Sequence, residues 1–269
     1  MSWNAIGLVL AVLAGVTPVA ELAGGGGPVD VARSPQAEGW DPPRDVLYDN
    51  GPFVNSPGTG VGGADESVAQ DVTLYMVTLG YANGVIGNNW LADDFVFPAG
   101  GWWLQAVTFY AYEPNAPTSP STFTEVRFAI LDSSPNTASP NIVYGDYTTN
   151  RLSSSVWTGC YRVKESTSGT SSQRPIMANR CELSTPVSLV PGPYWIVWLS
   201  GGPSGAVYAP PISISGQVTT GNGLQFVGSG WAETRESGTY AWQGFPFVLE
   251  GMPTSVEPTT WGSVKALFR

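Results

Sequence analysis

The chain has 269 residues and a formal net charge of −10, with only 11 Lys and Arg residues. Nucleic-acid binding depends on clustered cations that contact phosphates, so this charge argues against a nucleic-acid partner. Histidine is absent, which excludes Ser-His-Asp and Cys-His mechanisms and essentially all catalytic zinc sites. Hydrophobic residues make up 42% of the chain and charged residues 12%, so a substantial core must lie under a surface of small polar residues.

The N-terminal region reads as a leader followed by a linker. Residues 1–20 contain the apolar run 5–16, which is shorter than the roughly 20 residues that a transmembrane helix needs. This run predicts a signal peptide, a secreted or cell-surface protein, and no transmembrane span. A buried N-terminal helix is the alternative. Residues 21–45 are rich in Gly and Pro and show no periodicity, which predicts a flexible linker.

Residues 46–251 alternate short runs of β-branched and aromatic residues with clusters of Gly, Pro, Asn and Ser. This pattern predicts one all-β domain, an antiparallel β-sandwich of the jelly-roll-like type. The expected strands are 72–81, 94–97, 102–112, 125–131, 142–147, 156–163, 175–183, 193–199, 206–208, 224–227 and 245–249.

The run 102–112 carries apolar residues on both faces, so we expect it to be a central strand. Its alternation places Trp103 and Phe109 on the same face, and both side chains are expected in the core. The run 194–199 is apolar at every position, which also predicts burial on both faces.

Cys160 and Cys181 are the two cysteines of the chain, and they lie on two neighbouring predicted strands. In an exported protein this pair predicts a disulfide, which would contribute about 3 kcal/mol in the entropic model. The alternative is a reactive thiol pair, but the chain has no histidine to activate it.

The acidic residues allow two kinds of site. Paired carboxylates could hydrolyse glycosides without histidine, but Asp93 and Asp94 are adjacent and must point to opposite faces of a strand. Calcium takes hard oxygen ligands, and Asp49, Asn50 and Glu250 lie at the two ends of the domain, which sandwich domains often bring together. Asp93 or Asp94 could complete such a Ca²⁺ site. The alternative is that these side chains cap turns.

A third kind of site would use aromatic side chains to hold a glycan. Trp231, Tyr240 and Trp242 lie in segments rich in Gly and Ser, and Trp90 follows two asparagines. These four residues are the predicted ligand-binding residues. The alternative is that the rings cover the ends of the sandwich.

Several short motifs resemble a β-sandwich domain found in secreted proteins of environmental bacteria. They are ADDF (92–95), TTNR (148–151), WTGCYRV (157–163), RPIM (174–177) and GFPF (244–247). The resemblance covers roughly residues 46–251. It implies an exported domain, and that domain has no established activity.

Residues 252–269 form a Pro-containing spacer and a tail, TTWGSVKALFR. The tail resembles a short sequence that ends many exported proteins of some uncultivated bacterial lineages. The resemblance implies sorting or anchoring, in which secretion or sorting machinery would read Trp261, Lys265 and Arg269. A simple amphipathic terminus is the alternative.

Together these observations predict an exported, non-catalytic binding or structural module for a glycan or for a surface or matrix protein. The alternative is a histidine-free carboxylate glycoside hydrolase or another polysaccharide-active enzyme. A hydrolase needs two carboxyl groups about 5–10 Å apart across one cleft. A binding module needs only a strip of aromatic rings.

Overall fold

The computed structural model describes residues 44–253. The predicted signal peptide, nearly all of the linker, and the tail with Trp261, Lys265 and Arg269 lie outside this range. Within it, no helix is long and apolar enough to cross a membrane.

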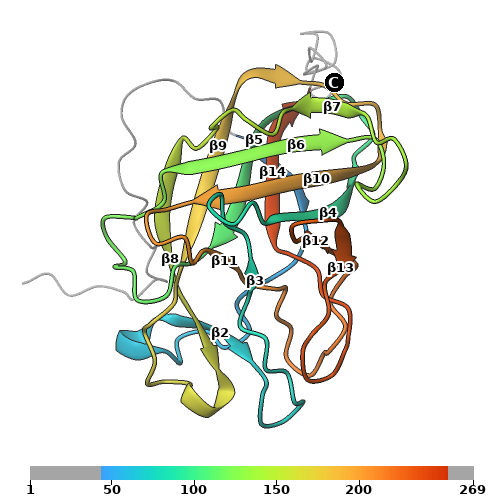
Figure 1. Cartoon of the computed structure of the whole chain (residues 1–269). Helices are drawn as coiled ribbons and strands as arrows, with labels where there is room; N and C mark the ends of the chain where they lie inside the picture. Colours follow the sequence, from blue (N-terminus) through green and yellow to red (C-terminus); the bar gives the residue numbers. More distant parts are fainter. Residues whose placement is uncertain (1–43, 254–269) are drawn as a thin grey trace, which may run out of the picture. The chain divides into compact units, whose positions relative to one another are not determined.

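Two six-stranded sheets pack face to face in the described residues (Figure 1). The first sheet has the order β1-β14-β5-β9-β8-β2, and the second has the order β13-β12-β4-β10-β6-β7. The first contains β1 (Asp45–Asp49), β2 (Asp65–Ala69), β5 (Trp102–Ala111), β8 (Ser154–Lys164), β9 (Pro175–Val187) and β14 (Phe247–Pro253). The second contains β4 (Trp90–Phe97), β6 (Glu125–Leu131), β7 (Ile142–Gly145), β10 (Gly192–Gly201), β12 (Leu224–Phe226) and β13 (Trp231–Glu233).

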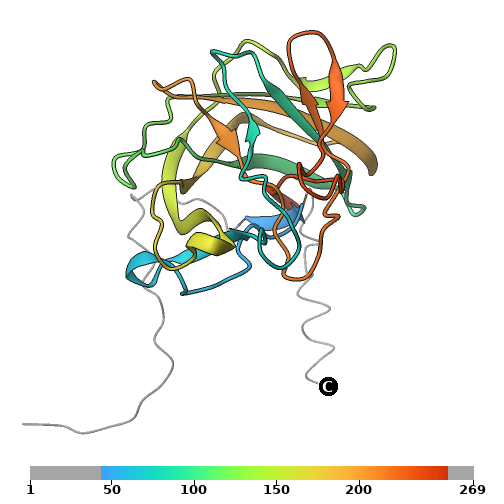
Figure 2. The same ribbon diagram turned by 60° about the horizontal axis from the view of Figure 1, so that its bottom comes forward.

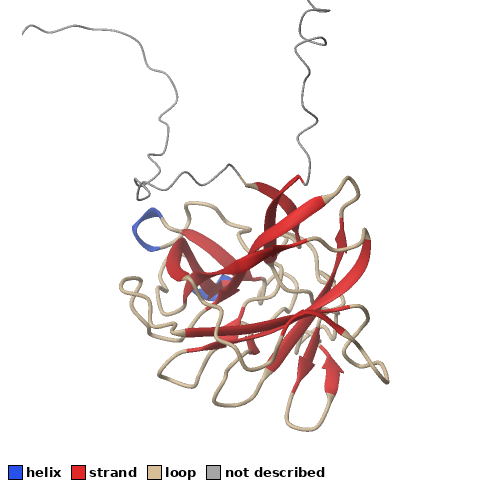
Figure 3. Ribbon diagram, turned by 90° about the horizontal axis from the view of Figure 1, so that it is seen from above, coloured by secondary structure: helices blue, strands red, loops and turns tan. Residues whose placement is uncertain are grey.

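The strand pairs of both sheets are antiparallel, except that β2 runs parallel to β8. The chain crosses repeatedly from one sheet to the other, for example from β4 to β5 and from β5 to β6. The remaining elements are the small ladder of β3 (Tyr81–Ala82) and β11 (Tyr208–Ala209), and the short helices η1 (Val61–Gly63) and η2 (Glu165–Thr167). Figure 3 shows the strands in red and these helices in blue. The predicted antiparallel β-sandwich is confirmed.

The space between the sheets is filled with aromatic side chains. The rings of Phe109 on β5 and Trp198 on β10 stack with centroids 5.0 Å apart, and Phe128 on β6 packs beside Phe109 at 5.6 Å. All three side chains are almost fully buried. Burying a large apolar side chain contributes about 1.5–3 kcal/mol, so this cluster supplies much of the stability of the sandwich. The predicted core position of Phe109 and the central place of β5 are confirmed.

The prediction for Trp103 is wrong, because a bulge reverses the alternation in β5. The ladder between β5 and β9 shifts between Leu104 and Ala106, and an extra residue at a bulge changes which face the following side chains occupy. Leu104 therefore joins Val107 and Phe109 between the sheets. Trp103 is left 38% exposed.

The predicted disulfide is also wrong, because Cys160 and Cys181 are free thiols, both buried. In the ladder between β8 and β9, Tyr161 lies opposite Pro175. Cys160 is thus separated from Cys181 by about five residues of strand, or roughly 16 Å. A disulfide needs Cα atoms within about 7 Å of each other. The two side chains also pack in different apolar clusters.

Below the sandwich in Figure 1 lies a second region, which we call the polar base. It consists of β2, the end of β8 that pairs with β2, η1, η2 and the loops 70–80, 210–222 and 234–244. The strand predicted at 72–81 does not form there, apart from Tyr81, the first residue of β3. Glu165 accepts hydrogen bonds from Val72 N and Thr73 N, and Glu236 accepts them from Val77 N and Thr78 N. These backbone donors therefore bind carboxylates in place of a neighbouring strand.

Candidate ligand-binding groove

The outer face of the second sheet carries a row of side chains that runs across the strands. Phe226 on β12 pairs with Trp231 on β13 and with Trp90 on β4. On the other side of β4, Leu91 pairs with Trp198 on β10, so Trp90 lies opposite Leu199. Leu199 in turn pairs with Arg127 on β6. Trp231, Phe226, Trp90, Leu199 and Arg127 thus occupy one line across five strands. With strands about 4.8 Å apart, the line is roughly 19 Å long.

A cavity of about 410 Å³ opens along this row. It is lined by Asn88, Trp90, Arg127, Tyr147, Phe226 and Trp231, and we call it the aromatic groove. Leu199, Val197, Ala92 and Ala129 form an apolar layer on the same face of the sheet. The groove brings together Trp90, which is only 8% exposed, and the half-buried Trp231, two of the four predicted ligand-binding residues.

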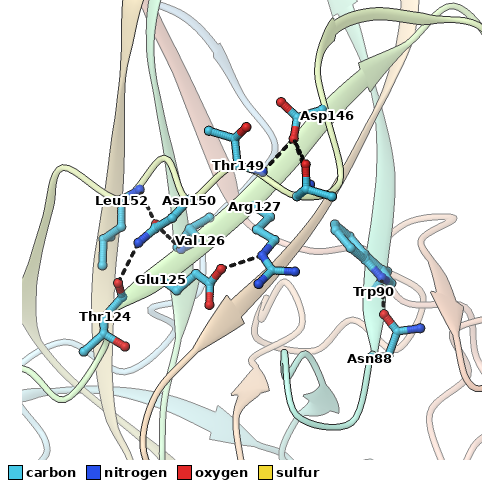
Figure 4. Close-up of polar contacts among 11 residues, drawn as sticks. Asn88, Trp90, Thr124, Glu125, Val126, Arg127, Asp146, Thr149, Asn150 and Leu152 are labelled. Atoms are coloured by element: carbon cyan, nitrogen blue, oxygen red, sulfur yellow. Dashed lines mark hydrogen bonds and ion pairs between the residues drawn. The ribbon is translucent and has the colours of Figure 1, made fainter.

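The indole ring of Trp90 is held in place from two sides. Its Nε1 donates a hydrogen bond of 2.9 Å to Asn88 Oδ1 (Figure 4), and Tyr147 meets the ring edge-on, with centroids 5.1 Å apart. Asn88 adopts a left-handed backbone conformation with φ of 48°, which asparagine tolerates better than most residues. The turn before β4 therefore aims the Asn88 side chain back at the indole.

Tyr147 belongs to a loop that the TTNR motif attaches to the sheet. Asp146 accepts hydrogen bonds from Thr149 N at 2.6 Å and Thr148 N at 2.8 Å, and these donors hold the pKa of its carboxyl well below the usual range. Arg151 pairs with Asp146 at 2.6 Å. Asn150 bonds to the backbone of β6 through Val126 N at 3.1 Å (Figure 4). The loop is thereby fixed beside Trp90.

Arg127 closes the other end of the row and forms an ion pair with Glu125 (Figure 4). The bond runs from Arg127 Nε to Glu125 Oε1. Within residues 44–253, no hydrogen bond occupies the two terminal nitrogens of Arg127, so these nitrogens can donate to a ligand. The pair offers donors on the guanidinium and acceptors on the carboxylate at one point of the groove.

Glu125 and Asp94, two carboxylates on this face, are too far apart to form a hydrolytic pair. Glu125 lies opposite Gly201 of β10, whereas Asp94 lies opposite Trp195 of the same strand. Six residues of β-strand separate these two positions by roughly 20 Å, which is well beyond the 5–10 Å of a glycosidase pair.

Asp93 points the other way, into the space between the sheets, and is only 1% exposed. Its carboxylate accepts hydrogen bonds from Phe245 N at 2.7 Å and from Asn50 Nδ2 at 3.0 Å. Burial raises the pKa of Asp93 to about 7, against the lowering effect of these donors. Asp93 thus links the end of β1 to the segment before β14.

The residues considered for calcium are only partly brought together. Asn50 contacts Asp93, but Asp49 accepts a turn hydrogen bond from Gly51 N at 2.9 Å, and Glu250 pairs with Arg180. Asp94 faces the opposite side of β4 from Asp93. Within residues 44–253, no group of three or more acidic or cysteine side chains could hold a metal ion.

The other two predicted ligand-binding residues lie away from the groove. Tyr240 and Trp242 belong to the loop 234–244 of the polar base, and neither lines the cavity. Sequence reasoning missed Asn88, Arg127, Tyr147 and Phe226. Their common feature is position in one cross-strand row or beside it, and only the register of the sheet reveals that.

Comparisons with protein-family models, curated proteins and solved structures found no match to this chain. Its function must therefore be argued from the chemistry of the groove itself.

Proposed function

We propose that this protein is a non-catalytic carbohydrate-binding module whose aromatic groove holds an extended glycan across the strands of the second sheet. The observation that carries the proposal is the alignment of Trp231, Phe226, Trp90 and Arg127 in one cross-strand row. A linear row of rings with a polar end suits a chain of sugar units better than a compact ligand.

The chemistry of the lining supports a sugar. Aromatic rings offer broad apolar surfaces to the C–H faces of pyranose rings, while Trp, Tyr and Asn side chains can also hydrogen-bond. The Arg127–Glu125 pair can donate to one hydroxyl and accept from its neighbour. Because Glu125 offsets the charge of Arg127 and the whole chain carries a charge of −10, a neutral glycan is favoured over an anionic one.

The rigidity of the groove supports binding as its role. The indole of Trp90 is held by Asn88 and Tyr147, and Phe226 and Trp231 pack against each other with centroids 5.6 Å apart. Rings that are already in place lose little conformational entropy when a ligand arrives. None of the six lining residues is a carboxylate, which favours binding over the alternative of glycoside hydrolysis.

Affinity electrophoresis tests the proposal. The folded domain is run in native gels that contain hydroxyethyl cellulose, xylan, mixed-linkage β-glucan or galactomannan. We expect at least one polysaccharide to retard the wild type. Trp231→Ala should weaken that retardation by about 30-fold in dissociation constant, or roughly 2 kcal/mol.

Trp103→Ala is the matched control, because Trp103 is also a partly exposed tryptophan but lies on the other sheet. It should bind like the wild type. The proposal is wrong if no gel retards the wild type, or if the Trp231 and Trp103 variants behave alike.

The proposal includes export to the cell surface or medium. The apolar run 5–16 and the tail 259–269 support it, together with the resemblance to exported bacterial sandwich domains. In the native host, the mature protein should have lost its first ~20 residues, and deletion of 259–269 should change where it accumulates. A mature protein that still begins at Met1 would contradict export through a cleaved leader.

A further inference from the structure

The polar base exposes three aromatic side chains that the groove does not use. Tyr75 is 66% exposed on the loop 70–80, while Tyr240 and Trp242 are 73% and 41% exposed on the loop 234–244. The two loops touch, since a side chain added at Gly238 would collide with the backbone oxygen and the ring of Tyr75. In Figure 2 the base is turned toward the viewer. We call these three residues the second platform.

Both tyrosines adopt a backbone conformation that favours glycine. Among the described residues, positive φ angles outside glycine occur at Tyr75 (56°), Asn88 (48°), Asn115 (65°) and Tyr240 (61°). Asparagine tolerates this region, but for a bulky residue it is strained. Such strain persists only where the surroundings enforce it, and it clusters at functional sites. Here the two strained tyrosines lie on loops that touch, and both are exposed to solvent.

A single buried carboxylate enforces this arrangement. Glu236 is 1% exposed and accepts hydrogen bonds from Val77 N and Thr78 N of one loop, at 2.6 and 2.7 Å. It also accepts them from Gly238 N and Thr239 N of the other loop, at 2.5 and 2.8 Å. Burial alone would raise the pKa of Glu236, but the donors outweigh it and lower the pKa. An ionised carboxylate thus clamps both loops.

The side chain of Trp242 is held in place by Arg235. The guanidinium of Arg235 lies over the indole, 4.7 Å from the ring centroid, and also binds Tyr240 O at 3.1 Å. Glu233 pairs with Arg235 at 2.6 Å. The cation covers part of the indole and fixes its orientation, while the rest of the ring remains exposed.

We propose that the second platform is a second carbohydrate-contact surface, separate from the aromatic groove. Three rings are too few for a stable protein interface, which buries about 1,200–2,000 Å². The rings stand among hydroxyl groups instead, such as the Thr78 and Ser237 pair, whose oxygens are 2.9 Å apart. Planar rings beside hydroxyls suit a neutral sugar, and the acidic chain disfavours an anionic lipid surface.

Two separate surfaces give the protein an ability that one groove lacks. Arg235 lies four residues beyond Trp231, about 13 Å along an extended chain, and no residue of the second platform lines the groove. A single molecule can therefore hold two glycan segments at once. On a polysaccharide with many sites, this produces avidity and bridges between chains.

The double variant Tyr75→Gly, Tyr240→Gly tests the proposal. Glycine adopts positive φ without strain, so the melting temperature should stay the same or rise although two aromatic rings are lost. Retardation in the hydroxyethyl cellulose, xylan, β-glucan and galactomannan gels should weaken at least tenfold. Light scattering from solutions of the same polysaccharides should rise with the wild type but not with this variant. Asn115→Gly is the control, because it changes a left-handed residue without removing a ring, and it should bind like the wild type.

The same measurements separate the two surfaces. If Trp231→Ala binds normally but the tyrosine variant does not, the groove proposal fails and the second platform stands. If the tyrosine variant is retarded like the wild type, or if no polysaccharide retards the wild type, the second platform is wrong. A lower melting temperature with unchanged binding would mean that the tyrosines serve the fold, and this too would overturn the proposal.

Discussion

The sandwich and the polar base are two regions of one domain that are held together by opposite means. In the sandwich, backbone groups bond to neighbouring strands, and the interior consists of rings such as Phe109, Phe128 and Trp198. In the base, strands are few, and the interior contains the ionisable side chains Glu66 and Arg162, which are at most 2% exposed. Buried charges are costly unless fully hydrogen-bonded, so the base depends on complete bonding rather than on area.

Arg162 shows how this works. Its guanidinium donates to the backbone oxygens of Leu79, Thr78 and Ser67 at 2.7, 2.9 and 3.2 Å, and to the hydroxyl of Ser213 at 2.8 Å. Glu66 does the converse and accepts from Gly169 N at 2.9 Å. One side chain in the base thus replaces a stretch of strand ladder. Removing one of these buried charged side chains therefore removes several hydrogen bonds at once.

The largest expected effect follows from breaking the base at Arg162. Arg162→Met keeps most of the volume but leaves three backbone oxygens without their donor, each costing about 1–3 kcal/mol. We expect a loss of about 4–6 kcal/mol in the free energy of unfolding, measured by urea denaturation. Arg162→Lys should recover only part of it, because an ammonium group cannot reproduce the fork of donors. A loss below about 1 kcal/mol would show that the base does not depend on this network.

Phe109→Ala is the corresponding break in the sandwich. It removes a fully buried ring that stacks on Trp198, and we expect a loss of about 3–5 kcal/mol from transfer and cavity terms. Trp103→Ala on the same strand should cost less than about 1 kcal/mol, because its ring is partly exposed. Similar losses for both variants in urea denaturation would contradict the bulge that separates their faces.

Asp93 is an ionisable side chain buried between the two sheets, as Glu66 and Arg162 are buried in the base, and it should make the stability of the protein depend on pH. Burial raises the pKa of Asp93 to about 7, so folding favours the protonated form. Its contribution is complete below pH ~4, the pKa of an unfolded aspartate, and is lost as the pH rises through ~7. The wild type should lose about 2–4 kcal/mol across this window relative to Asp93→Asn. Parallel pH profiles for the two proteins in denaturant titrations would refute this.

The smallest expected effect concerns the thiols. Because Cys160 and Cys181 are free, a reducing agent should not change the melting temperature. The unreduced protein should show two titratable thiols once denatured. Burial raises the pKa of both thiols to about 12, so the native protein should react slowly. Finding no thiols after denaturation would restore the predicted disulfide.

The two regions also differ in how well their sequence predicts them. Alternation of apolar residues predicts β5, β6 and β10, because strands with an apolar face must bury it. The same rule fails for 72–81, where Glu165 and Glu236 lie about 90 and 160 residues away in the chain and take the backbone donors. The alternation rule also fails at Trp103, because the amino-acid composition of β5 does not reveal the bulge. The sequence predicted two residues of the groove, Trp90 and Trp231. Arg127 and Phe226 could be found only from the register of the second sheet.

The pairing of β1 with β14 has a practical consequence. Asp45, near the start of the described residues, lies opposite Gly251, near their end. The domain therefore begins and ends at one edge of the first sheet, with its two chain ends side by side. It can be spliced as a cassette into an exposed loop of a carrier protein with short spacers. The groove, on the outer face of the second sheet, would then face away from the splice points.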